Sequence, residues 1–381
     1  MASGPSHPGN RHGNRIAIAA GGPGPSGIST YVTELGRALT VRGHEVEVLI
    51  PESPPRRRRA TDRIVPSALA RPRSAWLRER LRELHPDIAH IVSSDMLAVD
   101  LGVPTVWTAW HTPHGLMSRW RASIAMRSYG TRQVLWEIAE SWTGYRLDSE
   151  ALRHCAAVAA VSQRLARELS TRGWDASWVP PILSLAGRGV PRTLPETPRV
   201  LFSSANLGAP RKGLDLLGKA LQSFGDRIPF ELDFIGAPDA RATGLLRGPT
   251  ADATVRMHGR VDLNRARDIM RDATVLAMPS RSEEFGYVAL EALALGLPVV
   301  TFEVPTLDEL VDSGCGRVVP PFDVDAFGHA LQEVTTDEAL YRRLSEGALR
   351  KSLAHSPDAC MPHLEALYER TRADAASQHL P

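Results

Sequence analysis

The chain has 381 residues, 43% of them hydrophobic, and a formal net charge of +2 at pH 7. This length and composition are typical of a globular protein with two or more domains. No apolar run approaches the roughly 20 residues of a membrane-spanning helix, and three widely spaced cysteines argue against a disulfide framework or a zinc cluster. Residues 1–14 are polar and rich in Gly, Pro and His, so we expect a disordered leader and a cytoplasmic protein.

The first half of the chain alternates predicted strands with helices, which favours a parallel sheet of the doubly wound kind. We predict helices that include 31–40 and 163–170. The predicted strands are, in chain order, 15–20, 45–50, 88–92, 105–108 and 156–161. We therefore assign residues 15–180 to one Rossmann-like domain.

A second α/β unit follows a proline-rich stretch. The stretch from Pro180 to Pro198 contains five prolines, including these two, so residues 181–198 are interpreted as a linker. Further strands are predicted at 200–204, 230–235, 254–257, 274–278 and 299–302, and the tail from Asp323 to about Ala376 is predicted to be helical. We assign residues 199–360 to a second Rossmann-like domain and 361–381 to a C-terminal helix and tail.

Basic residues are concentrated in the first half, where residues 1–180 carry 23 arginines and no lysine against 16 acidic residues. Much of this excess is the run Arg56 to Arg59 behind two prolines. We interpret the run as a solvated loop, with contact to an anionic acceptor or a membrane surface as the alternative. No nucleic-acid-binding motif accompanies it, so we predict no nucleic-acid partner.

A glycine loop between the first strand and the first helix allows two interpretations. Gly22 to Gly27 fits the dinucleotide fingerprint G-x-G-x-x-G, which would indicate an NAD(P)-dependent oxidoreductase. The acid that should follow the second strand is represented only by Glu52, and two prolines stiffen the loop. The oxidoreductase therefore remains an alternative.

Lys212 is one of only three lysines in a chain with 42 arginines. It lies with Arg211 in a loop that leads from the first strand of the second domain into a predicted helix over 214–221. A compact ammonium group near a helix N-terminus suits a phosphate.

The most informative segment runs from Pro279 to Pro298 and places Glu283 and Glu291 eight residues apart around a strand-to-helix turn at Gly286. A helix beginning there offers free N–H groups to a phosphate or a sugar hydroxyl. Solvated acids on an ordinary amphipathic helix are the alternative reading.

This segment resembles the signature of retaining glycosyltransferases of family four (glycosyl transferases group 1), which have the two-domain GT-B fold. The resemblance implies two Rossmann-like domains facing across a cleft and a C-terminal helix that crosses back to the first domain. It implies that Glu283 contacts the transferred sugar and that Glu291 accepts hydrogen bonds from the ribose diol. Phe285, Gly286 and Tyr287 would complete the donor-binding turn.

The same resemblance extends to other loops. Lys212 matches the family's lysine-glycine phosphate loop, although the arginine that relatives carry several residues earlier is replaced by the adjacent Arg211. Gly27 matches the first glycine loop, which faces the donor. Arg260 matches a position that frames the nucleobase, with a surface turn arginine as the alternative.

The family also places a histidine from the first domain near the sugar. His111 and His114 are both candidates, and we favour His111. Asp323 and Asp325 have the D-x-D spacing of some metal sites, but an N-cap carboxylate explains them more simply. We predict no metal and no cofactor.

The function that follows is transfer of a sugar, with its anomeric configuration kept, from a nucleoside-diphosphate sugar to a hydroxyl of a small-molecule, glycan or lipid-linked acceptor. The resemblance favours UDP as the nucleotide and requires no protein nucleophile. A nucleotide-sugar epimerase of the same fold is a further alternative.

Overall fold

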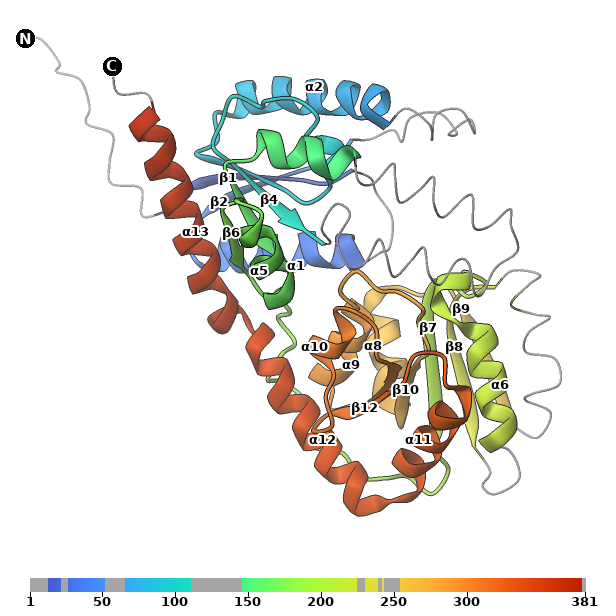
Figure 1. Cartoon of the computed structure of the whole chain (residues 1–381). Coiled ribbons are helices and arrows are strands. Elements are labelled where there is room, and N and C mark those ends of the chain that lie inside the picture. Colours follow the sequence, from blue (N-terminus) through green and yellow to red (C-terminus); the bar gives the residue numbers. More distant parts are fainter. Residues whose placement is uncertain are drawn as a thin grey trace, which may run out of the picture.

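The computed structural model describes residues 13–21, 27–51, 66–110, 146–224, 230–238, 242 and 254–378. Two six-stranded sheets, one in each half of the chain, organise these residues, and every recorded strand pair is parallel. Figure 1 shows the first domain in blue to green and the second in yellow to orange. The predicted pair of Rossmann-like domains is confirmed.

The first sheet has the strand order β2-β1-β3-β4-β5-β6. Its strands are β1 Arg15–Ala19, β2 Glu45–Leu49, β3 Ile88–Ile91, β4 Thr105–Ala109, β5 Ala157–Ala160 and β6 Ala176–Trp178. The helices of this domain include α1 Gly27–Val41, α2 Pro66–Leu84 and α5 Gln163–Thr171. Because helices cover parallel sheets, central strands such as β3, β4 and β5 are buried along their whole length.

The second sheet has the order β12-β11-β10-β7-β8-β9. Its strands are β7 Arg199–Asn206, β8 Glu231–Ala237, β9 Thr254–Gly259, β10 Val275–Met278, β11 Val299–Phe302 and β12 Gly316–Val319. The helices include α6 Leu214–Phe224, α8 Leu263–Asp272, α9 Tyr287–Ala294, α10 Leu307–Leu310, α11 Val324–Thr336 and α12 Glu338–Ser352. The strand order reverses between β7 and β10, and ligands of doubly wound sheets bind outside the carboxyl ends of strands at such a point. The loops after β7 and β10 hold Lys212 and Glu283.

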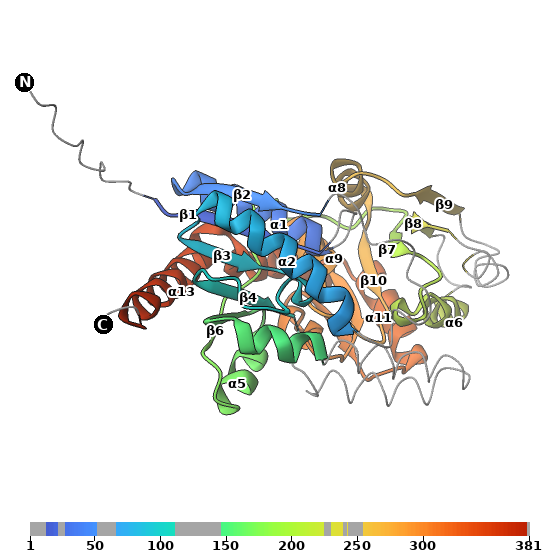
Figure 2. The same ribbon diagram turned by 90° about the horizontal axis from the view of Figure 1, so that it is seen from above.

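The C-terminal helix α13, Pro357–Gln378, follows the second domain in the chain and returns to the first. It packs against α1, β4, β5 and β6 of the first domain, and Figures 1 and 2 show it lying along that domain's sheet. The Tyr368 hydroxyl lies 2.5 Å from the buried Nδ1 of His90 on β3. The expected crossing helix is therefore confirmed.

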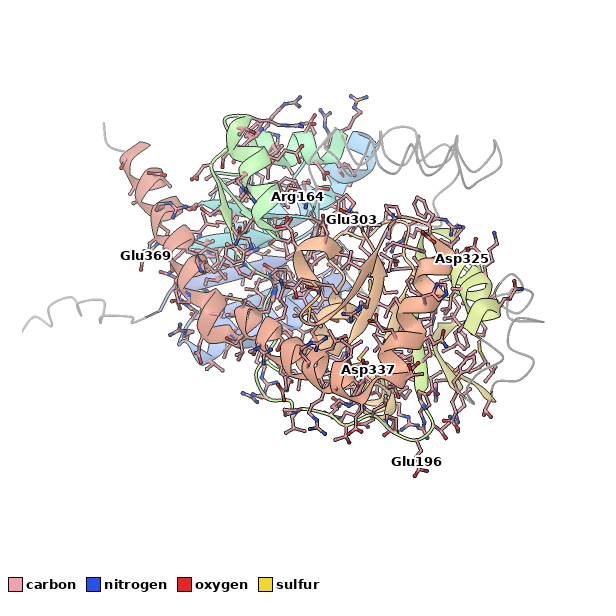
Figure 3. All side chains as sticks on the ribbon, turned by 60° about the horizontal axis from the view of Figure 1, so that its bottom comes forward. Arg164, Glu196, Glu303, Asp325, Asp337 and Glu369 are labelled. Atoms are coloured by element: carbon pink, nitrogen blue, oxygen red, sulfur yellow. The ribbon has the colours of Figure 1, made fainter. Side chains whose placement is uncertain are left out.

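A second contact between the domains is an ion pair. The Arg164 guanidinium on α5 donates a hydrogen bond of 2.7 Å to Asp308 on α10. Figure 3 labels Arg164 where the first domain meets the second. The domains are thus joined by polar contacts as well as by the chain.

Within the described residues, strands β6 and β12 and helices α2 and α10 were not among the sequence predictions. Strands β6 and β12 are short and lie at sheet edges, where pairing with β5 and β11 defines them. Helix α2 follows the arginine run Arg56 to Arg59, and both that run and residues 1–12 of the leader lie outside the described residues.

Asp323 caps α11 by accepting a hydrogen bond from the Ala326 N–H at 2.9 Å, as predicted. No helix within the described ranges is long and apolar enough to span a membrane.

Candidate active site

The turn after β10 is set by Gly286. This residue is the N-cap of α9 and has φ 91°, a left-handed conformation that favours glycine. Helix formers, mostly Ala and Leu, then carry α9 into the core, where all of it except Val288 is buried. The predicted strand-to-helix turn is confirmed, and it presents the helix N-terminus at the edge of the sheet.

Glu283 lies in this turn with only 4% of its surface exposed. Its Oε1 accepts hydrogen bonds from Lys212 Nζ and from Ser280 Oγ, both at 2.6 Å. Arg211 Nη1 lies 3.9 Å from the other oxygen. Burial raises the pKa of this carboxyl, but Lys212 and then Arg211 outweigh burial and leave the pKa below its ordinary value. Glu283 is therefore ionised at neutral pH.

The loop that carries Lys212 is fastened to the Glu283 turn by backbone contacts. Gly213 has φ 74°, and a Cβ at this position would lie 1.9 Å from the Pro279 carbonyl oxygen. The Arg281 N–H donates to the Arg211 carbonyl at 2.7 Å. The Arg281 side chain holds Asp215 through two hydrogen bonds of 2.8 and 2.6 Å. This clamp fixes Lys212 relative to Glu283.

Glu291 lies inside α9 and is 5% exposed. Burial raises its pKa to about 7, although the Arg267 guanidinium on α8 favours the ionised form. Arg267 Nη2 lies 3.2 Å from Glu291 Oε1. This carboxyl thus titrates close to neutral pH.

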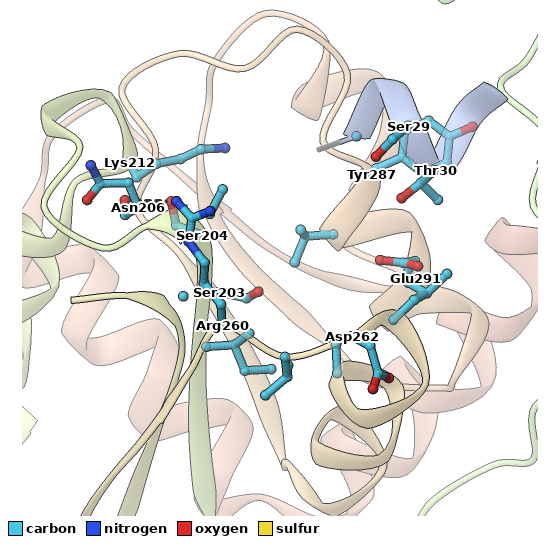
Figure 4. A pocket seen from close by; sticks show the side chains of 18 of the residues that line it. Ser29, Thr30, Ser203, Ser204, Asn206, Lys212, Arg260, Asp262, Tyr287 and Glu291 are labelled. Atoms are coloured by element: carbon cyan, nitrogen blue, oxygen red, sulfur yellow. Dashed lines mark hydrogen bonds between the residues drawn. The ribbon is translucent and has the colours of Figure 1, made fainter. Parts of the chain in front are cut away.

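A cavity of about 510 Å³ opens between the domains beside these groups. Figure 4 shows Ser29 and Thr30 of α1 across the cavity from Lys212 and Asn206, with Glu291 on the side of α1. A smaller hollow of about 250 Å³ adjoins the Glu283 turn. The predicted residues that line one or both hollows are Gly27, Arg211, Lys212, Arg260, Glu283, Phe285, Gly286, Tyr287 and Glu291. Every predicted site residue within the described ranges therefore faces this region.

The two histidine candidates, His111 and His114, lie outside the described residues. Trp110, which precedes His111, lines the smaller hollow, and its Nε1 donates to the Val92 carbonyl at 3.0 Å. The end of β4 thus reaches the site from the first domain.

Several residues that line the larger cavity were not predicted. Ser203, Ser204 and Asn206 come from the carboxyl end of β7, and Asp262 is the N-cap of α8. A position at the end of the first strand of a doubly wound domain was the signal that could have identified the first three.

Comparison with known proteins gives two family matches. The family model described as Glycosyltransferase Family 4 matches residues 25–182, and the one described as Glycosyl transferases group 1 matches residues 197–337. These matches overturn the oxidoreductase alternative. Residues 22–26 of the glycine loop on which it depended lie outside the described part of the chain.

Individual relatives agree with the family matches. A D-inositol 3-phosphate glycosyltransferase of Jonesia denitrificans is 35% identical over 44% of this chain and 42% of its own length, so the match spans less than half of that relative. A phosphatidyl-myo-inositol mannosyltransferase of Mycolicibacterium smegmatis is 27% identical over 83% of each chain. The structure of a sucrose-phosphate synthase from Thermosynechococcus elongatus superimposes with a TM-score of 0.71 at 20% identity, covering 95% of this chain and all of that one. The chain therefore belongs to the family-four glycosyltransferases and has their two-domain GT-B fold.

Proposed function

We propose that this glycosyltransferase moves a sugar from a UDP-sugar to a hydroxyl of a small-molecule, glycan or lipid-linked acceptor, without a metal and with retention of the anomeric configuration. The observation that carries the proposal is the pair of hollows between the domains, because cations, a buried acid and a helix N-terminus line them. This lining suits the separate parts of one extended ligand, a nucleotide-sugar.

The cations suit the leaving diphosphate. Lys212 and Arg211 line both hollows, and the N-terminus of α9 faces the smaller one. Preorganised positive groups stabilise the charge that develops on a departing phosphate, and the clamp by Arg281 holds these groups in place before the donor arrives. The proposal assigns this charge stabilisation to the protein alone.

Glu283 suits the transferred sugar. An ionised carboxylate only accepts hydrogen bonds, so it can orient sugar hydroxyls but cannot supply a proton to the leaving group. With no protein nucleophile assigned, the departing phosphate oxygen accepts the proton of the acceptor hydroxyl as the new glycosidic bond forms on the same face. His111 is proposed to contact the sugar from the first domain.

Glu291 and Arg260 suit the nucleoside. Both line the larger cavity, Glu291 from inside α9 and Arg260 from the turn after β9. We assign the ribose diol to Glu291 and the base to Arg260. Gly27 lies against the donor turn, since a Cβ there would be 3.5 Å from the Tyr287 Cβ, so α1 closes the cavity from the first domain.

The names of the two curated relatives point to inositol-type acceptors. A direct test incubates the protein with UDP-sugars in the presence of EDTA, with D-inositol 3-phosphate or phosphatidylinositol as acceptor, and determines the product's anomeric configuration by NMR. An α-linked product from an α-linked donor, lost in Lys212→Ala, supports the proposal. Inversion, a requirement for metal, or donor conversion without acceptor would contradict it, the last outcome indicating an epimerase.

A further inference from the structure

An arginine bridge connects the proposed ribose acid to the first domain. Arg267 Nη2 on α8 lies 3.2 Å from Glu291 Oε1 on α9 and 3.2 Å from Glu34 Oε1 on α1. The Arg267 side chain is 16% exposed, and both carboxylate side chains are below 10%. A single nitrogen thus joins two buried acids that belong to different domains.

The bridge extends to the chain segment between the domains. The second carboxylate oxygen of Glu34 accepts a hydrogen bond from the Ser184 N–H at 2.9 Å. Two residues earlier in that segment, the Ile182 carbonyl accepts a hydrogen bond from the Tyr287 hydroxyl at 3.0 Å. The donor-side helix α9 therefore contacts the connecting segment directly through Tyr287 and indirectly through Arg267 and Glu34.

Because the three side chains of the bridge are charged, removing any one of them should change the ionisation of the others. Two acids share one guanidinium, so neither is fully compensated. Around Glu291 the interacting groups are Arg267 from α8, Glu34 from α1 and Tyr287 one turn earlier on its own helix. After burial, Arg267 has the largest effect on the pKa of Glu291 and lowers it, whereas Glu34 raises it. Removing Arg267 and removing Glu34 should therefore have opposite effects on ionisation of Glu291.

We propose that Arg267 is a positioning residue for Glu291, and that the Glu34–Arg267–Glu291 bridge, which the first domain and the connecting segment hold in place, tunes how well Glu291 binds the ribose. The inference rests on the proposed role of Glu291 in binding the ribose. Ribose hydroxyls donate hydrogen bonds, and an ionised carboxylate is the better acceptor. Nucleotide affinity then falls as the pH falls through the pKa of Glu291.

The test measures nucleotide affinity by calorimetric titration from about pH 5.5 to about pH 8.5. The probe is UDP, or GDP if the wild-type protein prefers it. The variants are Arg267→Gln, Glu34→Gln and, as a matched control on the same helix, Arg271→Gln, whose side chain is 52% exposed. Titration of the ligand phosphate is common to all proteins, so differences between variants report on the protein.

The midpoint of the pH dependence should move to higher pH in Arg267→Gln and to lower pH in Glu34→Gln. We expect a shift of about one pH unit for the loss of the arginine, because a charge within contact distance moves a carboxyl pKa by that much or more. Arg271→Gln should match the wild type. Thermal unfolding of each variant checks that it is folded, and Glu34→Gln keeps the test valid if Arg267→Gln does not fold.

Two other outcomes separate this inference from the proposed function. If Glu291→Ala weakens nucleotide binding but the midpoints of Arg267→Gln and Glu34→Gln do not move in opposite directions, the bridge is overturned and the ribose assignment stands. If Glu291→Ala leaves affinity unchanged at every pH, the ribose assignment fails and the bridge fails with it.

Discussion

Replacing Lys212 by methionine should destabilise the protein, because it leaves the Glu283 carboxylate buried without its nearest cation. Lys212 Nζ lies 2.6 Å from Glu283 Oε1, and Glu283 is 4% exposed. Removing one partner of a buried ion pair typically costs 3–5 kcal/mol. The Lys212 side chain retains 15% exposure and Arg211 remains nearby, so we expect the lower end, about 3 kcal/mol.

This loss corresponds to a fall of roughly 6–12 °C in Tm for a domain of this size, measured by differential scanning calorimetry. Adding Glu283→Gln to Lys212→Met removes the uncompensated charge and should restore about 2 kcal/mol of it. Lys351→Met is the matched control, because Lys351 makes a comparable 2.8 Å contact with Asp312 on the exposed surface. That change should cost less than about 1 kcal/mol.

The sign of the pH dependence provides a second check. In the wild type the folded-state pKa of Glu283 is below its ordinary value, so this pair contributes stability above that value and loses it as pH falls. Without Lys212, burial should raise the pKa, and protonation then relieves the buried charge. The deficit of Lys212→Met should be larger at pH 7 than at pH 5. A deficit equal to that of Lys351→Met, or a double variant no more stable than Lys212→Met, would refute the reasoning.

Two further predictions concern other parts of the fold. Burial lowers the pKa of His90 to about 3, so below about pH 6.5 the unfolded chain binds a proton at this residue that the folded chain does not. The free energy of unfolding should therefore fall as the pH falls from 6.5 towards 3, by up to about 1.4 kcal/mol per pH unit. His90→Gln should flatten that slope when denaturation is measured at several pH values. Gly213→Ala should weaken nucleotide binding and should lower the unfolding temperature more than Gly173→Ala does. Both glycines have positive φ, but of the two only Gly213 would bring a Cβ against backbone, the Pro279 carbonyl oxygen. Equal losses would argue against close contact between the Lys212 loop and the Glu283 turn.

The central strands could be predicted because their short, mostly apolar sequences are typical of strands that are buried on both faces of a sheet. β1, β3, β10 and β11 are short apolar runs that the structure buries on both faces, and their predicted bounds agree to within one or two residues. Strands β6 and β12 have three and four residues and lie at sheet edges. Their conformation depends on pairing with a neighbour, which local sequence does not encode.

The same distinction between local sequence and long-range contacts applies to the candidate active site. The Gly286 turn and the spacing of Glu283 and Glu291 are local in sequence. The structure places Glu283 in that turn and Glu291 in the helix that follows it. The contacts that set their ionisation are long-range. Lys212 is 71 positions from Glu283. The pKa of Glu291 is raised by burial, which depends on how α9 packs in the folded protein, so neither pKa shift could be read from the motif.

The central claim is that the cavity between the domains binds the nucleoside diphosphate of a sugar donor. The most direct measurement is the thermal stabilisation of the purified protein by UDP, GDP, ADP, dTDP and NAD(P), compared with the Glu291→Ala variant, because a ligand that binds only the folded state raises its stability. We predict a clear rise in Tm with UDP that is diminished in Glu291→Ala and absent with NAD(P). Stabilisation by NAD(P) alone, or by no nucleoside diphosphate, would contradict the account.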